Sequence, residues 1–136
     1  KAQEELKDTH YFIIKLHPHT QVHTEGTNCD IPSEELLPVA DIVITDYSSI
    51  LFDAMIYQLP LVLFAPDLEE YLASRGFYLD YRTLPGIHIQ KEEQLVKVLS
   101  DEARLNSSVN QKYHDFFQDY MAACDGNATR RIMNYV

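Results

Sequence analysis

Residues 40–66 read ADIVITDYSSILFDAMIYQLPLVLFAP, and they contain two apolar runs that flank a short stretch with helical spacing. The continuous apolar centre of residues 41–46 is typical of a strand that is buried on both faces, as in parallel sheets. Residues 59–64 form a second run of this kind, and Ser48 to Gln58 is predicted as the helix between the two strands. This order predicts a right-handed βαβ crossover and therefore a parallel sheet.

The rest of the chain continues the alternation of strands and helices. Residues 11–16 are mostly apolar and rich in β-formers, so they are predicted as a strand that ends before Pro18. Residues 77–90 are predicted as a loop with a turn at Pro85-Gly86. We therefore expect three or four strands and an α/β fold, a Rossmann-like parallel sheet flanked by helices. Further helices are predicted over residues 1–9, 33–37, 67–75 with Gly76 as C-cap, 90–100, 107–121 and 127–135.

The composition argues against several classes of protein. The chain has 136 residues, of which 46% are hydrophobic, and this suits one domain with a real core. The formal net charge of −10 argues against a nucleic-acid surface, because phosphate contacts need clustered Lys and Arg. A single phosphate pocket is still compatible with that charge, since backbone N–H groups can bind an anion. No apolar run approaches the roughly 18 residues that span a membrane.

The cysteines and the first residues bear on the origin of the chain. Cys29 and Cys124 are far apart and lack metal-ligand spacing, so we interpret them as reduced thiols of a cytoplasmic protein. The chain begins with KAQEELKDTH, without an initiator Met or a visible signal peptide. We predict that residues 1–136 form a single domain that is a piece of a longer chain.

Ser48 and Ser49 lie where the carboxyl end of a predicted strand meets the start of a helix. The first N–H groups of a helix have no partner within the helix, and the helix dipole places partial positive charge there. A phosphate can occupy such a position, and two hydroxyls would add donors. The alternative is that Ser48 only caps the helix. The chain contains neither G-x-G-x-x-G nor a Walker A lysine, so a dinucleotide site of the usual kind is not expected.

Four charged residues are candidates for contacts around such a phosphate. Asp53 lies one turn beyond Ser49, where a carboxylate could accept both hydroxyls of a ribose, or could simply be a solvated helix charge. Asp67 and Glu69 open the helix after the third predicted strand and could face a hydroxylated ligand, although acids are favourable at any helix start. Arg75 could approach a phosphate or pair with a nearby acid instead.

His17 follows the first predicted strand and belongs to the same edge of the sheet. Its near-neutral pKa range suits a general base or a ligand of a phosphate oxygen, and an ordinary loop histidine is the alternative. The spacing of His17, His19 and His23 resembles a zinc site only loosely, because Pro18 and an irregular loop give no clear ligand geometry. We predict no metal site and no cofactor.

Seven stretches taken together resemble the C-terminal half of the CDP-glycerol glycerophosphotransferase family, the polymerases and primases of bacterial wall teichoic acid. The block DYSS-x-x-FD, followed in order by D-x-E-E-Y and R-G-F-Y, makes the resemblance specific. The stretches are LHPH at 16–19, ADIVITDYSSILFDA at 40–54, Leu-Pro-Leu-Val at 59–62, DLEEY at 67–71, RGFYLDY at 75–81, Pro85-Gly86, and DGNATRRI at 125–132.

The resemblance implies a GT-B architecture of two Rossmann-like domains, with this chain as the C-terminal, donor-nucleotide-binding half. It places Ile31-Pro32 near the base, Ser48 and Ser49 on the diphosphate, and Asp53 on the ribose. His17 becomes the candidate active-site histidine, as a base for the acceptor hydroxyl or as a stabiliser of the pyrophosphate. The chain departs from the usual Pro-Gly-Pro of the family at Pro85-Gly86-Ile87.

The implied reaction is attack by an acceptor hydroxyl on the β-phosphorus of CDP-glycerol, with release of CMP. The expected partners are CDP-glycerol, a lipid-linked glycerol phosphate acceptor and the N-terminal domain of the parent chain. The parent protein is expected to lie peripherally at the cytoplasmic face of the membrane. No nucleic acid is expected. The alternatives are a related transferase that uses CDP-ribitol or a sugar nucleotide, and a nucleotide-binding module without catalysis.

Overall fold

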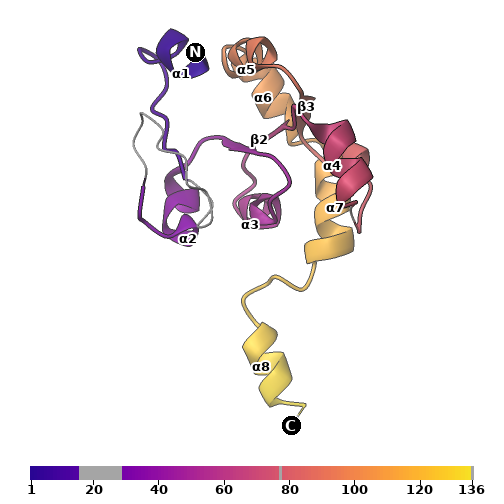
Figure 1. The fold of residues 1–136 in the computed structure, drawn as a ribbon. Helices are drawn as coiled ribbons and strands as arrows, with labels where there is room; N and C mark the ends of the chain where they lie inside the picture. The colour runs from indigo at the N-terminus through magenta and orange to yellow at the C-terminus, as the bar shows by residue number, and fades with distance from the viewer. Residues whose placement is uncertain (16–28, 77, 136) are drawn as a thin grey trace.

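The computed structural model describes residues 1–15, 29–76 and 78–135. Within these residues, three strands form one parallel sheet in the order β1-β2-β3 (Figure 1). Strand β2 (Leu61–Phe64) lies in the middle, between β1 (Val43–Thr45) and β3 (Ile87–Ile89). In the register of the sheet, Val43 pairs with Leu61, and Val62 pairs with Ile87. The parallel α/β fold predicted from residues 40–66 is therefore confirmed.

Ten helical segments surround or follow the sheet in the described residues (Figure 1). Most are short, and α7 is the longest, with 11 residues. They are α1 (Ala2–Glu5), α2 (Ser33–Leu36), the 3-10 helix η1 (Leu37–Val39), α3 (Ile50–Ile56), α4 (Leu68–Ser74), the 3-10 helix η2 (Tyr81–Thr83), α5 (Glu92–Leu99), α6 (Glu102–Ser108), α7 (Gln111–Met121) and α8 (Ala128–Met133).

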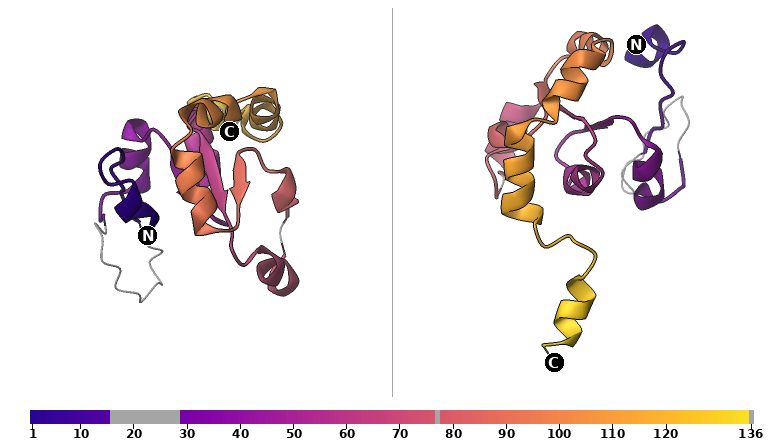
Figure 2. Two further views of the ribbon diagram at one scale, coloured as in Figure 1. Left: turned by 90° about the horizontal axis from the view of Figure 1, so that it is seen from above. Right: turned by 180° about the vertical axis from the view of Figure 1, so that it is seen from behind.

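The sheet is covered on both faces, and Figure 2 shows helices around the strands in two further views. Side chains alternate along β2, so Leu61 and Leu63 face one core and Val62 faces the other, and all three have no exposed surface. The first core contains residues of α3 and α7, including Met55 and Tyr113. The second contains residues of β3, α5 and α1. Burial on both faces explains the continuous apolar run of β2.

The strand predicted over residues 11–16 is wrong for the described part, which ends at Lys15. Ile14 forms only an isolated bridge, and its carbonyl accepts a hydrogen bond from the Cys29 N–H at 3.1 Å. Residues 11–15 lie outside the three-stranded sheet, and the Tyr11 side chain is 82% exposed. An apolar β-forming run becomes a strand only when it reaches a sheet edge, and this run is not paired with β1.

The loop predicted over residues 77–90 is also wrong in part, because it contains β3. Gly86 has a φ of +118°, and a Cβ added there would lie 2.8 Å from the Leu61 carbonyl oxygen. Glycine thus lets the chain turn against the backbone of β2 and enter a three-residue strand at once. The Pro85-Gly86 turn signal was visible in the sequence, but a strand this short gives no periodic pattern.

The helix predicted over residues 107–121 is split into α6 and α7. Val109 leaves the helical conformation, and Asn110 starts α7 with its side chain accepting a hydrogen bond from the Tyr113 N–H at 3.3 Å. The C-cap predicted at Gly76 is confirmed, because its φ is +68° and its N–H donates to the Tyr71 carbonyl at 3.4 Å. Helix α8 lies apart from the sheet and its flanking helices (Figure 1).

Candidate functional site

The polar residues that follow β1 and β2 meet at the carboxyl edge of the sheet. Tyr47 lies just after β1, and Asp67 lies just after β2 at the start of α4. The Tyr47 hydroxyl donates a hydrogen bond of 2.7 Å to Oδ1 of Asp67. Ligands of open α/β sheets bind outside this edge, so the contact joins two loops at the place where a ligand is expected.

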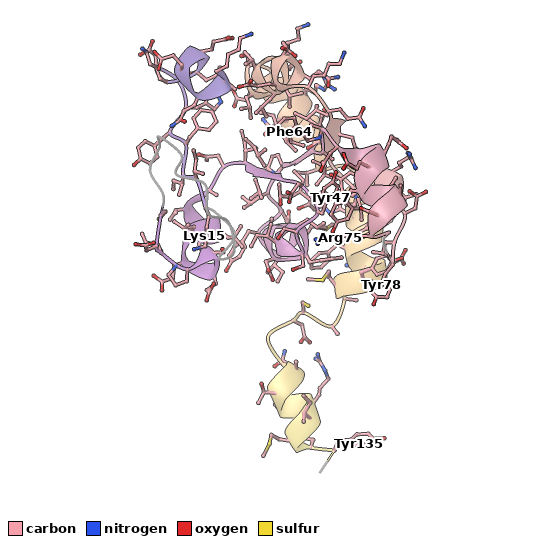
Figure 3. All side chains as sticks on the ribbon, in the orientation of Figure 1. Lys15, Tyr47, Phe64, Arg75, Tyr78 and Tyr135 are labelled. Atoms are coloured by element: carbon pink, nitrogen blue, oxygen red, sulfur yellow. The ribbon has the colours of Figure 1, made fainter. Side chains whose placement is uncertain are left out.

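Aromatic rings extend the site from this contact. The ring of Tyr47 stacks on that of Tyr71 with centroids 3.7 Å apart, and it lies 5.4 Å from that of Tyr81. The guanidinium carbon of Arg75 lies 5.9 Å from the centre of the Tyr71 ring, within the range of a cation–π contact. Figure 3 shows Arg75 and Tyr47 in the same part of the molecule. Arg75 thus stands near the Tyr47–Asp67 pair.

The hydroxyls of both inner tyrosines stay protonated. Partial burial, the hydrogen bond to Asp67 and the charge of that carboxylate together raise the pKa of Tyr47 well above its usual value. Burial, followed by the charges of Asp46 and Asp67, raises the pKa of Tyr81 to about 12. The Tyr81 hydroxyl donates to the Asp46 carbonyl at 3.2 Å. Both groups therefore act as fixed hydrogen-bond donors, not as bases.

Ser48 and Ser49 stand at the start of α3, and both are exposed. The Ile50 N–H donates to Oγ of Ser48 at 3.3 Å, but Ser48 precedes the N-cap, so the prediction that Ser48 caps the helix is wrong. Ser49 occupies the N-cap position without a hydrogen bond from its own side chain to the helix. Asp53 lies in the first turn of α3 and is exposed. These three side chains are open to a ligand, and their role in binding one stays a prediction.

Glu69 has a partner that the sequence did not reveal. The Nη2 atom of Arg82, in η2, donates to Oε1 of Glu69 at 2.7 Å. Asp67 and Glu69 are thus placed differently, since Asp67 is held by a neutral tyrosine and Glu69 by a cation. Arg82 was missed because it belongs to a stretch predicted as a loop. Tyr47 was missed although it lies inside the quoted stretch 40–66, directly before Ser48.

The remaining candidates are not brought to this site by the described residues. Ile31 and Pro32 precede α2, which lies apart from α3 (Figure 1). The Ile31 carbonyl accepts a hydrogen bond from the Lys15 side chain at 2.9 Å. His17 lies outside the described residues, as do His19 and His23.

The described residues give no sign of a metal site or of a membrane-spanning helix. Over residues 1–15, 29–76 and 78–135, no group of three or more His, Cys, Asp or Glu side chains could hold a metal ion. In the same residues, no helix has the length and apolar character needed to cross a bilayer.

The chain is similar to proteins named as teichoic acid polymerases and primases. A model of the family described as CDP-Glycerol:Poly(glycerophosphate) glycerophosphotransferase matches residues 1–136. Among curated relatives, the teichoic acid poly(ribitol-phosphate) polymerase of Bacillus spizizenii is 29% identical over 100% of this chain and 23% of its own length. The teichoic acid glycerol-phosphate primase of the same organism is 28% identical over 100% of this chain and 37% of its own length.

Solved structures give the same result. The wall teichoic acid polymerase TagF has a TM-score of 0.79 and 27% identity, over 98% of this chain and 35% of that one. A variant of TagF soaked with CDPG has a TM-score of 0.73 and 27% identity, over 98% and 36% of the two chains. The chain thus spans between about a quarter and two fifths of the length of these relatives.

Proposed function

The chain belongs to the CDP-glycerol:poly(glycerophosphate) glycerophosphotransferase family, and from this premise we propose that it is the donor-binding half of a glycerophosphotransferase. In this proposal the parent protein moves glycerol phosphate from CDP-glycerol to a lipid-linked glycerol phosphate acceptor in teichoic acid synthesis. The observation that carries the proposal is the family match over residues 1–136, which includes the polar cluster at the carboxyl edge of the sheet. The likeness to TagF supports the place of this domain in a GT-B architecture.

In this proposal the start of α3 receives the diphosphate of the donor. The hydroxyls of Ser48 and Ser49 supply donors, and Arg75 supplies positive charge from the end of α4. Asp53 accepts the ribose hydroxyls one turn further on, and Ile31 and Pro32 lie towards the base. These roles are supported by the resemblance of the motifs and by the exposure of Ser48, Ser49 and Asp53.

Asp67 is the better of the two acids for holding the glycerol of the donor. Its Oδ1 atom is fixed by the Tyr47 hydroxyl, which leaves Oδ2 to accept from a polyol hydroxyl. Glu69 faces a competing cation, since its carboxylate is bound by Arg82 at 2.7 Å. We therefore propose that Asp67 binds the glycerol of the donor and that Glu69 holds Arg82 in place.

The reaction proceeds by displacement at phosphorus. The oxygen of the acceptor hydroxyl bonds to the β-phosphorus while the bond from that phosphorus to the bridging oxygen breaks, and CMP leaves with the electron pair. His17 acts beside the reacting phosphorus, as the base that takes the hydroxyl proton or as a ligand of the phosphate. The residues of this half contribute position and fixed charge, which account for most of the catalysis of phosphoryl transfer.

A lipid-linked acceptor implies peripheral contact of the parent protein with the cytoplasmic face of the membrane. Residues 1–136 have a formal net charge of −10, which anionic lipids repel. We therefore assign the membrane contact, together with the second domain of the GT-B fold, to parts of the parent outside these residues.

A ribitol donor is the second candidate, because a ribitol-phosphate polymerase is as similar to this chain as a glycerol-phosphate primase is. The ribitol-phosphate polymerase and the glycerol-phosphate primase match this chain at 29% and 28% identity over its full length, so identity does not separate the two polyols. The nucleotide contacts proposed above serve either donor, because both carry cytidine diphosphate. The polyol contact at Asp67 is where they differ.

Calorimetric titration of the 136-residue chain tests the proposal. The ligands are CDP-glycerol, CDP-ribitol, CMP and UMP, and the variants are Ser48→Ala/Ser49→Ala and, as a matched control, Ser100→Ala/Ser107→Ala. We expect cytidine ligands to bind and the first variant to weaken CDP-glycerol binding at least about tenfold, since each charge-assisted hydrogen bond to phosphate is worth about 1.5–3 kcal/mol. The control should bind like the unmodified chain. Equal loss in both variants, or no preference for cytidine, would contradict the proposal.

A further inference from the structure

A hollow lies at the carboxyl ends of β2 and β3. It is not lined by any of the residues assigned above to the donor. It has a volume of about 440 Å³ and is bounded by η2 and by the first residues of α4 and α5. This volume is within the range of sites for small ligands. Its floor is apolar and consists of Leu63, Ala65, Leu68 and Ile89.

The rim of the hollow carries hydrogen-bond donors. Oε1 of Gln94 accepts from the N–H groups of Gln90 and Lys91, at 3.0 Å each, so this side chain is fixed with its amide nitrogen still able to donate. No described residue accepts a hydrogen bond from that nitrogen. Arg82 is fixed in a similar way, because only its Nη2 atom is bound to Glu69 and a guanidinium has five N–H donors.

His88 adds an acceptor to the same rim. Its Nε2 atom lies 2.9 Å from the Leu84 carbonyl, which can only accept, so Nε2 carries the hydrogen. In the neutral ring, Nδ1 is then an acceptor for a hydroxyl group. The ring is also held edge-on against Tyr81, with centroids 5.5 Å apart.

These groups select a small anion with hydroxyls. None of the described residues that line the hollow is acidic, and the Glu69 carboxylate beside the rim is already bound by Arg82, so a metal ion or an ammonium group would find no free counter-charge. A phosphate fits the donors of Arg82 and Gln94, a hydroxyl fits Nδ1 of His88, and a short carbon chain fits the apolar floor. A polyol phosphate combines all three features.

The hollow adjoins the proposed donor site through Tyr81. Tyr81 lines the hollow, its hydroxyl binds the Asp46 carbonyl, and its ring lies 5.4 Å from that of Tyr47. Leu68, on the floor, directly follows Asp67. We propose that this hollow binds the polyol phosphate end of the acceptor, next to the donor. The inference rests on the proposed function, which assigns a polyol phosphate chain as acceptor.

The probe for the test is sn-glycerol 3-phosphate, added to the 136-residue chain and followed by amide chemical shifts. The variant is Gln94→Glu, because a carboxylate still accepts the two backbone hydrogen bonds and suits a helix start, but repels an anion in the hollow. Gln118→Glu, on the exposed side of α7, is the matched control with the same change of charge. CMP is titrated separately and reports on Ser48 and Ser49.

We expect the probe to shift the amides of Arg82, His88 and Gln90, with a dissociation constant on the order of 1 mM, as is usual for so small a ligand. Gln94→Glu should weaken this binding at least tenfold, and Gln118→Glu should leave it unchanged. Shifts confined to Ser48 and Ser49, no shifts at all, or equal binding by both variants would overturn the inference. If CMP binds at Ser48 and Ser49 in any of these cases, the proposed function is still supported. If CMP does not bind but sn-glycerol 3-phosphate binds in the hollow as expected, the result contradicts only the proposed function.

Discussion

Single hydrogen bonds between tyrosine hydroxyls and the backbone or an acid recur through this molecule, and their energetic weight depends on burial. Tyr113 is 1% exposed, and its hydroxyl donates to the Leu59 carbonyl at 3.0 Å. Burial raises the pKa of this hydroxyl, so it remains a donor throughout the physiological range. Tyr120, on the same helix, is 52% exposed. The two residues make a matched pair for measuring the effect of one hydroxyl.

We expect Tyr113→Phe to lower the free energy of unfolding by about 1–2 kcal/mol, because the Leu59 carbonyl would be left buried without its donor. Tyr120→Phe should change it by less than about 0.5 kcal/mol. Urea denaturation of both variants measures the difference. Equal values for the two variants would mean that the Tyr113 hydroxyl has no stabilising role.

The Tyr47 hydroxyl should affect ligand binding more than stability. Tyr47→Phe keeps the ring that stacks on Tyr71 but frees Oδ1 of Asp67, so the carboxylate loses its fixed orientation. We expect the affinity for CDP-glycerol to fall about threefold to tenfold while that for CMP, which lacks the polyol, is unchanged. Titration calorimetry measures both, with Tyr57→Phe as the exposed control. A parallel loss for CMP would place Tyr47 in the nucleotide contact instead.

Among the elements, the turn into β3 depends on one glycine. Gly86→Ala would place a Cβ 2.8 Å from the Leu61 carbonyl oxygen at a φ of +118°, so both steric clash and backbone strain oppose it. We expect it to destabilise the fold by more than about 2 kcal/mol. Gly126→Ala, at a φ of +73° with no atom within 4 Å of the added Cβ, should cost about 1 kcal/mol. Denaturation curves that rank the two in the opposite order would contradict this reading.

The start of α8 is fixed by an acid whose titration can be followed. The Asp125 carboxylate accepts hydrogen bonds from Arg131 at 2.7 and 2.8 Å and from the Asn127 N–H at 2.9 Å. These contacts lower its pKa from 3.8 to about 2. Because the pKa of the folded state lies below that of the unfolded state, the contact stabilises α8 above about pH 4 and is lost as the pH falls towards 2.

Carboxyl-carbon NMR shifts should therefore show a midpoint for Asp125 near the lower value. We expect Arg131→Gln to return that midpoint towards 3.8, since it removes the cation that is the largest cause of the shift. An unchanged midpoint in this variant would mean that Arg131 does not hold Asp125 in solution.

The parts of the fold that the sequence predicted are those with long, continuous apolar patterns. The runs at 41–46 and 59–64 became β1 and β2, and both faces of β2 are covered, whereas Ile44 of β1 is 37% exposed. Residues 87–89 lack such a pattern, since His88 interrupts a strand of three residues, so β3 was predicted as loop. Residues 11–15 have the pattern but no partner strand, and local residue preference cannot reveal that.

The site was predictable in part for the same reason. The positions of Ser48, Ser49 and Asp67 at the starts of α3 and α4 were predictable because strand ends and helix starts can be located from the apolar runs. The Tyr47–Asp67 hydrogen bond and the Arg82–Glu69 pair join residues that are 20 and 13 positions apart, and no local spacing encodes such contacts. His17, the candidate for the active-site histidine, lies outside the described residues and stays a prediction.

At the scale of the whole molecule, α8 contributes little to the core. None of its residues is buried, and Ile132 and Met133 are 64% and 70% exposed. We expect a chain shortened to residues 1–121 to unfold with a free energy within about 0.5 kcal/mol of the full 136 residues. Thermal denaturation of the two chains side by side measures this. A markedly less stable short chain would mean that α8 packs against the remainder in solution.

The central place of β2 has a consequence for synthesis on the ribosome. Parallel strands need long crossovers, so β2 can pair with β1 once residue 64 has emerged, but its second neighbour arrives only with residues 87–89. The face of the sheet that carries Val62 is covered only when α5, which ends at Leu99, has been synthesised. We expect the nascent chain to form β1, α3 and β2 first and to keep an uncovered apolar face until Leu99 has been made. Chaperone contact during translation should concentrate in that interval.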